Sequence, residues 1–248
     1  MFRLNDGEYI EEPLADSSAF CHGIGVYETI KLVFDEDECF IRAEYLVDHY
    51  RRLQHGIEYL GLKTNLTFHM IEQAISSIVV KYKPKFGAVK IIVAATKYPN
   101  CEIYMSYEPR VYVQSKYDDG FKLKISKIKR NQTSLVCQIK SISNLENMLE
   151  LYSARDQGYD EVLYLNTDGY IAEGSISNVF WQSGRIIYTP SLECGILPGI
   201  MRHQVIERYR ARGYIIREGM FELNDIYCSD RIFLTNSLLG EITAYLGT

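Results

Sequence analysis

Helix-like and strand-like segments alternate along the whole chain, and this mixture limits the fold more than any single motif does. Over residues 43–60 the apolar side chains return every three or four positions, as on the buried face of an amphipathic helix. The stripe consists of Leu46, Tyr50, Leu53, Ile57 and Leu60. β-rich runs lie on both sides of this helix, at residues 26–34 and 88–95, and the second half of the chain repeats the mixture. Helices combined with mostly hairpin-linked strands predict the α+β class.

The best candidate for a linker is the short polar stretch at residues 117–120, Tyr-Asp-Asp-Gly, which ends in glycine. We therefore expect an N-terminal α+β lobe over residues 1–116 and a C-terminal α+β lobe over residues 121–248. The second lobe would contain a helix over residues 145–156 and would carry Lys140, which is discussed below.

Composition excludes several classes of protein. The chain is 47% hydrophobic and 24% charged with a net charge of −5, which fits an ordinary globular protein and disfavours a dedicated nucleic-acid binder. We interpret the basic cluster at residues 122–130 as the solvated face of a strand. Six cysteines without a CxxC pair indicate reduced thiols, and five histidines without metal spacing predict no metal site. No signal segment and no membrane-length apolar run are visible, so we expect a cytoplasmic protein.

Two polar residues in the second half have the chemistry that pyridoxal phosphate (PLP) requires. Lys140 follows the apolar run at residues 135–139, which we interpret as a buried strand, and precedes a helix. A partly desolvated lysine amine can attack the cofactor's aldehyde and form an imine. Glu173 lies where a strand leaves a turn, and its carboxylate can keep a pyridine nitrogen protonated. Either residue alone is more often an ordinary surface side chain.

A phosphate group needs a helix N-terminus with free backbone amides and a nearby cation. Residues 195–202, Gly-Ile-Leu-Pro-Gly-Ile-Met-Arg, predict such a helix start, with the amides of Ile200 and Met201 in its first turn. Arg52 is the candidate cation because it lies off the apolar stripe of its helix. The turn after the last strand could add further donors from Thr235, Asn236 and Ser237.

Together these segments resemble the fold type IV PLP enzymes, the class IV aminotransferase family. Residues 23–29 are similar to the family's G-D-G-V-F/Y-E-T strand and residues 49–53 to its H-x-x-R-L helix. Residues 173–180 resemble its E-x-x-x-x-N-x-F signature, and residues 199–202 its G-I-T/M-R turn. The resemblance covers nearly the whole chain and implies a two-lobed architecture like that of D-amino-acid aminotransferase, a homodimer and bound PLP.

The resemblance also implies roles for individual residues. Lys140 would form the imine and move protons, and Glu173 would pair with the pyridine nitrogen. Tyr27 would line the substrate pocket. Ser177 and Asn178 of the signature would contact the cofactor. The remaining cofactor contacts, toward the phosphate, would come from Arg52, Ile200, Met201, Thr235, Asn236 and Ser237.

The reaction is less clearly specified, because the family includes aminodeoxychorismate lyases as well as branched-chain and D-amino-acid aminotransferases. The pair Leu145-Glu146 after Lys140 is lyase-like, and the tyrosine that branched-chain enzymes carry there is absent. We therefore expect a lyase that releases pyruvate and forms p-aminobenzoate for folate synthesis. An amino-acid aminotransferase is the alternative, and a binding protein without turnover is a third hypothesis.

Two departures from the family pattern affect substrate choice. Family members usually carry an arginine in the loop after the strand at residues 88–95, where it can hold a substrate carboxylate. This chain has Lys97 there, which could substitute as a point charge. Residues 240–243, Gly-Glu-Ile-Thr, are nearer to the D-amino-acid aminotransferases.

Overall fold

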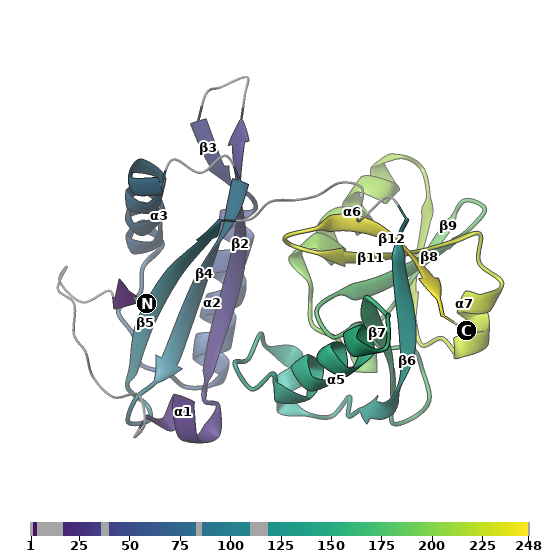
Figure 1. Ribbon diagram of the computed structural model, residues 1–248, viewed down its shortest axis with the longest axis horizontal. Helices are drawn as coiled ribbons and strands as arrows, with labels where there is room; N and C mark the ends of the chain where they lie inside the picture. Colours follow the sequence, from purple (N-terminus) through teal and green to yellow (C-terminus); the bar gives the residue numbers. More distant parts are fainter. Residues whose placement is uncertain (1, 4–16, 36–39, 83–85, 110–118, 248) are drawn as a thin grey trace. The chain divides into compact units, whose positions relative to one another are not determined.

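The computed structural model describes residues 2–3, 17–35, 40–82, 86–109 and 119–247 (Figure 1). The chain forms two compact units: Met1–Tyr112 with Ile139–Ser143, and Val113–Gln138 with Asn144–Thr248. The expected linker at residues 117–120 lies partly outside the described residues. Ile139–Ser143, which we expected in the C-terminal lobe, groups with the first unit because its backbone bonds to a strand there.

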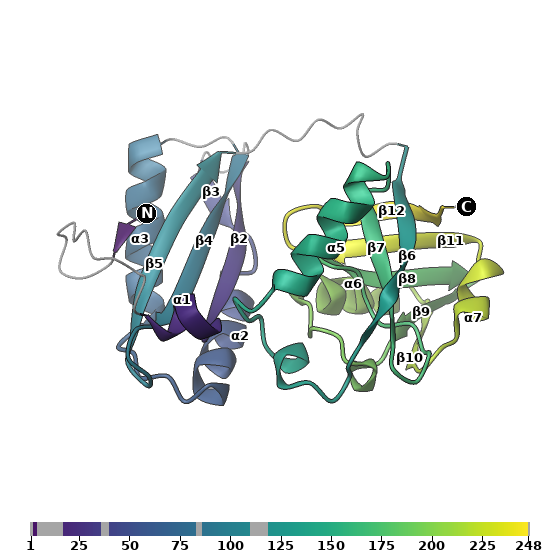
Figure 2. The same cartoon turned by 60° about the horizontal axis from the view of Figure 1, so that its bottom comes forward.

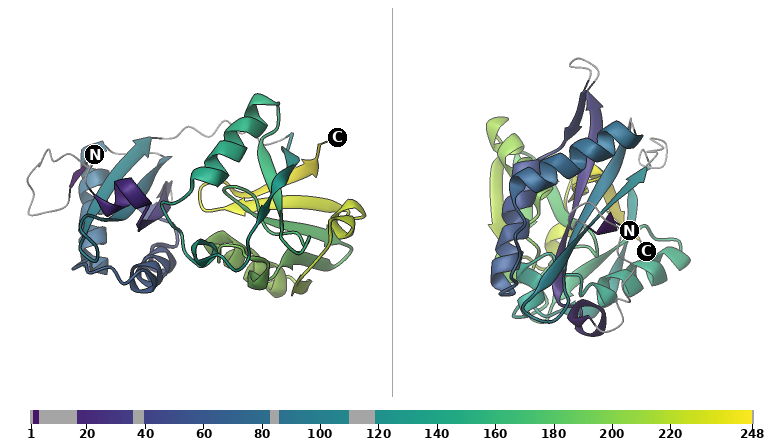
Figure 3. Two further views of the ribbon diagram at one scale, coloured as in Figure 1. Left: turned by 90° about the horizontal axis from the view of Figure 1, so that it is seen from below. Right: turned by 90° about the vertical axis from the view of Figure 1, so that its left-hand side faces the viewer.

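The first unit is built on a five-stranded antiparallel sheet of order β1-β5-β4-β2-β3. Its strands are β1 (Phe2–Arg3), β2 (Gly25–Asp35), β3 (Phe40–Ala43), β4 (Phe86–Ala95) and β5 (Cys101–Pro109). Its helices are α1 (Ser18–His22), α2 (Leu46–Tyr59) and α3 (Phe68–Tyr82). Helices α2 and α3 cover the same face of the sheet (Figure 3). The helix predicted over residues 43–60 is confirmed as α2.

Strand β2 separates two chemical environments because its side chains alternate between the faces of the sheet. Val26, Ile30 and Leu32 are buried against Leu53 of α2 and its neighbours in the core. Tyr27 points to the opposite face and is only half-buried. A site on one face of the sheet would therefore contain different residues of β2 from a site on the other face.

The second unit contains a seven-stranded mixed sheet of order β10-β9-β8-β11-β12-β6-β7 (Figure 2). Its strands are β6 (Phe121–Arg130), β7 (Glu161–Asn166), β8 (Asn178–Ser183), β9 (Ile186–Pro190), β10 (Ile215–Gly219), β11 (Arg231–Asn236) and β12 (Gly240–Leu246). Its helices are α5 (Leu145–Asp156), α6 (Ile200–Ala211) and α7 (Leu223–Tyr227), with short 3-10 turns η2 (Leu135–Gln138) and η3 (Leu192–Cys194). Helix α5 packs on β7, whereas α6 packs on β8, β9 and β11. The α+β class is confirmed.

No helix among the described residues is both long enough and apolar enough to span a lipid bilayer. Within the same part of the chain, no group of three histidine, cysteine, aspartate or glutamate side chains is arranged to hold a metal ion.

Candidate functional site

Lys140 is held against the edge of β2 by its backbone. The amide of Tyr27 donates a 2.9 Å hydrogen bond to the carbonyl of Lys140, and the amide of Ile142 donates to the carbonyl of Gly25 at 3.1 Å. These bonds form an isolated antiparallel bridge between Val26 and Ser141. The Lys140 ammonium lies 4.5 Å from the centroid of the Tyr27 ring, so the structure brings these two predicted site residues together.

The run before Lys140 is not the buried strand that we expected. It forms the 3-10 turn η2, in which the amide of Cys137 bonds to the carbonyl of Ser134 at 3.2 Å, and Leu135 is 68% exposed. The apolar, partly β-branched composition predicted a strand, but local i to i+3 bonds satisfy the backbone instead. Lys140 is half-buried, and its position comes from β2 rather than from a strand of its own.

Glu173 has a carboxylate fixed by several donors in the second unit. Its Oε2 accepts hydrogen bonds from Asn178 Nδ2 at 3.1 Å and from the amide of Leu197 at 3.0 Å. Its Oε1 lies 3.5 Å from Nη2 of Arg130, an ion-pair distance beyond good hydrogen-bond geometry. Glu173 itself is 8% exposed. A buried carboxylate oriented by fixed donors is well suited to pair with a protonated ring nitrogen.

Arg130 is a candidate site residue that the sequence did not identify. We assigned its basic cluster to a solvated strand face, and for Arg130 this was wrong, because its side chain is 11% exposed. Its guanidinium carbon lies 4.5 Å from the ring centroid of Tyr164, and its Nε and Nη2 have no hydrogen-bond partner among the described residues. Burial raises the pKa of the Tyr164 hydroxyl and outweighs Arg130, which lowers it, so this group stays neutral. In the sequence, the only sign of this position was that Arg130 is a basic residue at the end of a strand.

Arg52 forms part of a buried ionic cluster on the helix face of the first sheet. Its Nε and Nη2 donate to the two carboxylate oxygens of Glu28 at 2.7 and 2.8 Å, and His49 Nδ1 lies 2.6 Å from Glu28 Oε2. Burial raises the pKa of Glu28, but Arg52 and His49 outweigh it and lower the pKa to about 2. Glu28 is therefore ionised at neutral pH and orients the guanidinium of Arg52. The sequence suggested Arg52 but not its carboxylate partner.

Helix α6 begins where we expected a phosphate site. Gly199 is its N-cap, and Ile200 and Met201 start the helix as buried residues. A Cβ at position 199 would collide with Oδ1 of Asn178, whose Nδ2 bonds both Glu173 and the carbonyl of Leu197. Asn178 therefore links the helix start to the fixed carboxylate, and glycine is required beside it.

The turn after β11 lies beside a small pocket of the second unit. Thr235 is 2% exposed, and its hydroxyl has no hydrogen-bond partner among the described residues. Asn236 Oδ1 accepts from the amides of Leu238 and Leu239 at 3.0 and 2.8 Å, so this side chain shapes the turn that contains Ser237. The pocket is lined by Phe121, Glu161, Ile176, Ser177, Leu234, Thr235, Asn236, Leu239 and Ile242.

Ser177 is held by a buried carboxylate that the sequence did not single out. Its hydroxyl donates to Glu161 Oε2 at 2.9 Å, and the same carboxylate accepts from the amides of Ser175 and Ile176 at 3.0 and 3.1 Å. The hydroxyl of Ser175 also bonds Glu161. Glu161 therefore fixes the loop that connects Glu173 to Asn178.

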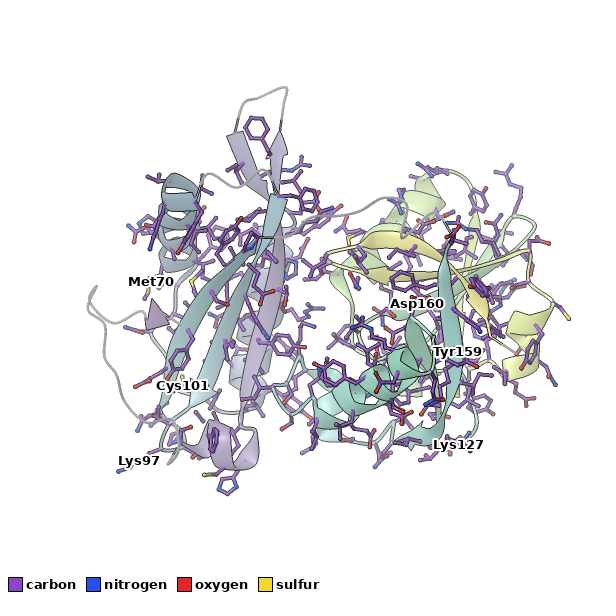
Figure 4. All side chains as sticks on the ribbon, in the orientation of Figure 1. Met70, Lys97, Cys101, Lys127, Tyr159 and Asp160 are labelled. Carbon is purple, nitrogen blue, oxygen red and sulfur yellow. The ribbon has the colours of Figure 1, made fainter. Side chains whose placement is uncertain are left out.

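Lys97 lies in the exposed loop between β4 and β5, where its carbonyl accepts from the amide of Asn100 at 2.9 Å. Figure 4 shows its side chain directed outward from the first unit. Its expected contact with a substrate carboxylate stays a prediction.

The donor set of the second unit fits a cofactor with a protonated aromatic nitrogen and a phosphate group. Glu173 offers an oriented buried carboxylate, and Arg130 and Thr235 offer buried donors without hydrogen-bond partners among the described residues. The start of α6 adds the backbone amides and dipole that favour a phosphate. Within the first unit, a lysine amine lies next to the Tyr27 ring, and Glu28 orients the guanidinium of Arg52.

Comparison with known proteins shows the family of this chain. The family model "Amino-transferase class IV" matches residues 25–244. The aminodeoxychorismate lyase of Bacillus subtilis is 33% identical over 96% of this chain and 83% of its own length.

Two solved structures show the same fold. One is named for 4-amino-4-deoxychorismate lyase from Legionella pneumophila, with a TM-score of 0.85 and 23% identity over 97% of this chain and 88% of that one. The other is the branched-chain amino acid aminotransferase of Escherichia coli, with a TM-score of 0.83 and 18% identity over 93% of this chain and 79% of that one. These scores confirm the predicted fold type IV architecture.

Proposed function

The chain belongs to the class IV aminotransferase family and is a PLP-dependent enzyme, and we propose that it is an aminodeoxychorismate lyase. The reaction releases pyruvate and forms p-aminobenzoate. The observation that carries this proposal is the likeness to the Bacillus subtilis lyase along almost the whole chain. The lyase-like pair Leu145-Glu146 after Lys140 agrees with this likeness.

The proposed cofactor contacts are those that the resemblance to the family implies. Lys140 would link covalently to PLP, which supplies an electron sink for bond cleavage beside the substrate amine. Glu173, held by Asn178 and Leu197, would accept the hydrogen bond of the ring nitrogen. Its fixed orientation means that little reorganisation is needed when charge develops. After the substrate amine displaces it, the Lys140 amine would remove and return a proton.

The phosphate would be bound by the remaining predicted residues. Arg52 would offer the guanidinium that Glu28 orients, and the amides of Ile200 and Met201 would donate from the first turn of α6. Thr235, Asn236 and Ser237 would add further donors, with Asn236 keeping the turn in shape. Ser177 would support the same region through Glu161, and Tyr27 would line the substrate pocket beside Lys140.

The decisive experiment supplies aminodeoxychorismate without an amino acceptor. A lyase releases pyruvate and p-aminobenzoate under these conditions, and both products can be quantified. Lys140→Ala should abolish their release, because alanine has no amine to form the imine with PLP or to move the proton. Substantial turnover by this variant would contradict the role assigned to Lys140.

An amino-acid aminotransferase is the second candidate, because a branched-chain aminotransferase shares the fold with a TM-score of 0.83. Such an enzyme would convert bound PLP to its amine form when an amino acid is added, and 2-oxoglutarate or pyruvate would reverse the change. A panel of D- and L-amino acids, followed by absorbance, separates this activity from the lyase. A protein that binds PLP and does neither would be a binding protein.

The assembly and location that we propose are a homodimer in the cytoplasm. The homodimer follows from the resemblance to the family. The location follows from six cysteines without a CxxC pair, which indicate reduced thiols. Sedimentation equilibrium of the purified protein tests the dimer, since a monomer at micromolar concentration would contradict it.

A further inference from the structure

We propose that Glu241 is a positioning residue for the phosphate-binding groups of the second unit, an inference that rests on the proposed function of the site. Glu241 lies on β12, directly opposite Thr235 of β11. Thr235 in turn lies directly opposite Asn178 of β8. These three residues form one row across the sheet, and two of them, Asn178 and Thr235, are expected to contact the cofactor.

The Glu241 carboxylate accepts hydrogen bonds from a helix and from a neighbouring strand. Its Oε1 accepts from the Tyr209 hydroxyl at 2.9 Å and from Arg231 Nη2 at 2.8 Å, and its Oε2 accepts from Arg208 Nη2 at 2.6 Å. Arg208 and Tyr209 lie in the last turn of α6, whereas Arg231 is the first residue of β11. Glu241 therefore joins the last turn of α6 to β11 and β12.

The surroundings of Glu241 make this junction stronger than a single exposed ion pair, which would contribute little. The Glu241 side chain is 16% exposed, and Tyr209 is buried against Phe233. Burial and the Glu241 carboxylate raise the pKa of the Tyr209 hydroxyl, so this group stays protonated and donates. Loss of the carboxylate would deprive three donors of this acceptor at once, and such networks contribute more than separate pairs.

Both ends of α6 are attached to the same row of the sheet. At its start, Gly199 lies so close to Asn178 that a Cβ would collide with Oδ1 of that side chain. At its end, Glu241 holds the last turn. Neighbouring strands lie about 4.8 Å apart, so the row from Asn178 to Glu241 spans about 10 Å. Residues 200–208 of a helix span about 12 Å, which matches the length of the row.

The groups expected to bind the phosphate depend on this arrangement. The Thr235 hydroxyl is buried without a hydrogen-bond partner among the described residues, and the amides of Ile200 and Met201 start α6. A displacement of the last turn of the helix would be transmitted to these amides, because the helix backbone is held by its own hydrogen bonds. Glu241 would not bind the phosphate itself, since its negative charge would repel the dianion.

The test compares the affinities of the wild type and of Glu241→Gln for PLP and for pyridoxal, which lacks the phosphate. Glutamine keeps the size of the side chain, but its NH2 group would face a donor. We expect the Kd for PLP to rise by about tenfold, the effect of one weakened hydrogen bond to a charged group. The Kd for pyridoxal should stay as in the wild type, because pyridoxal does not use the phosphate-binding groups. Fluorescence titration of the full-length chain freed of PLP measures both constants.

Glu207→Gln is the matched control, because Glu207 is exposed on the same helix and pairs with Arg210 at 2.7 Å. It should leave both affinities unchanged. Arg208→Met removes one donor to Glu241 and leaves the other two, so it supplies a second measurement should Glu241→Gln fail to fold. It should weaken PLP binding by a smaller factor and leave pyridoxal binding unchanged. In the double variant the two effects should not add, because both act through the same contact.

An unchanged Kd for PLP in Glu241→Gln would overturn the proposal. Equal losses of affinity for PLP and pyridoxal would also overturn it, because they would indicate a general structural role for Glu241. A loss of the same size in Glu207→Gln would show that any charge change on α6 has this effect, which would likewise reject the specific role of Glu241.

The same titrations separate this proposal from the proposed function. If the wild type binds PLP more tightly than pyridoxal and Glu241→Gln loses this preference, the role of Glu241 is supported even when aminodeoxychorismate is not cleaved and the lyase assignment fails. If the wild type cleaves aminodeoxychorismate but binds PLP and pyridoxal equally, the lyase assignment holds and the role of Glu241 is rejected. If the wild type binds neither compound, both proposals fail.

Discussion

At the scale of single residues, two buried carboxylates perform different tasks because they have different partners. Glu28 is paired with Arg52 through two short hydrogen bonds, which neutralise both groups within the first unit. Glu173 has two neutral donors on Oε2 and a more distant guanidinium, Arg130, near Oε1. Glu28 is thus an orienting residue, whereas we propose that Glu173, whose carboxylate is held by Asn178 and Leu197, pairs with a protonated ligand.

Replacing Glu173 with glutamine should separate cofactor binding from catalysis. The amide keeps the size of the side chain but cannot carry the negative charge that a protonated ring nitrogen requires. We expect PLP still to bind while kcat falls by about 100-fold or more, as when one preorganised electrostatic contact is lost. Glu193→Gln, an exposed change in η3, is the control, and the same kcat for both variants would refute the charge argument.

Glu28 should stabilise the protein in a pH-dependent way. Arg52 and His49 outweigh burial and lower the pKa of this carboxyl from an ordinary 4.5 to about 2. A carboxyl with a lowered pKa contributes stability that is present above about pH 4.5 and is lost as the pH falls toward 2. Glu28→Gln should therefore lower the free energy of unfolding by roughly 3 kcal/mol at pH 7, since it removes one partner of a buried pair.

Urea unfolding of wild type and Glu28→Gln at pH 7 and pH 3 measures this contribution, which should be smaller at the lower pH. Glu58→Gln is the matched control, because Glu58 is exposed on the same helix α2. A penalty of equal size at both pH values would show that ionisation of Glu28 is not its source.

At the scale of elements, the start of α6 depends on one contact between a helix and a strand. Gly199 has no room for a Cβ beside Asn178, the first residue of β8. Gly199→Ala should displace Asn178 and shift the amides of Ile200 and Met201, and we expect PLP to bind about tenfold more weakly or worse. Fluorescence titration with PLP measures the change.

Gly158→Ala distinguishes this effect from a general loss of stability. Gly158 has a φ of 78° after α5, and a Cβ there would meet nothing within 4 Å. The substitution should cost about 1 kcal/mol of stability through backbone strain and leave PLP affinity unchanged. If both variants lost PLP equally, the contact with Asn178 would not explain the result.

At the scale of the whole molecule, the proposed cofactor contacts come from residues far apart in the chain, so binding of PLP should stabilise the fold. A ligand at 100 times its dissociation constant adds about 2.7 kcal/mol. We expect PLP to raise the melting temperature in differential scanning calorimetry and pyridoxal, which lacks the phosphate, to raise it less. Equal shifts would argue against a dedicated phosphate site.

The amino-acid sequence by itself determined the local elements and the candidate chemistry. The period of three to four residues predicted α2, and the glycine and proline around Gly199 predicted the start of α6, because both signals depend on neighbouring residues. Family-like motifs identified Lys140 and Glu173. The run before Lys140 was predicted wrongly, since its composition suits a strand whereas its backbone bonds close a 3-10 turn.

Only the tertiary structure decided which distant side chains meet. It buried Arg130 beside Glu173, paired Arg52 with Glu28, and placed Lys90 and Lys140 at the Tyr27 ring. It also joined the Lys140 segment to β2 of the first unit. Such contacts depend on strand order and register, which bring together residues that are far apart in the sequence. Burial and neighbouring charges then determine whether each group is ionised.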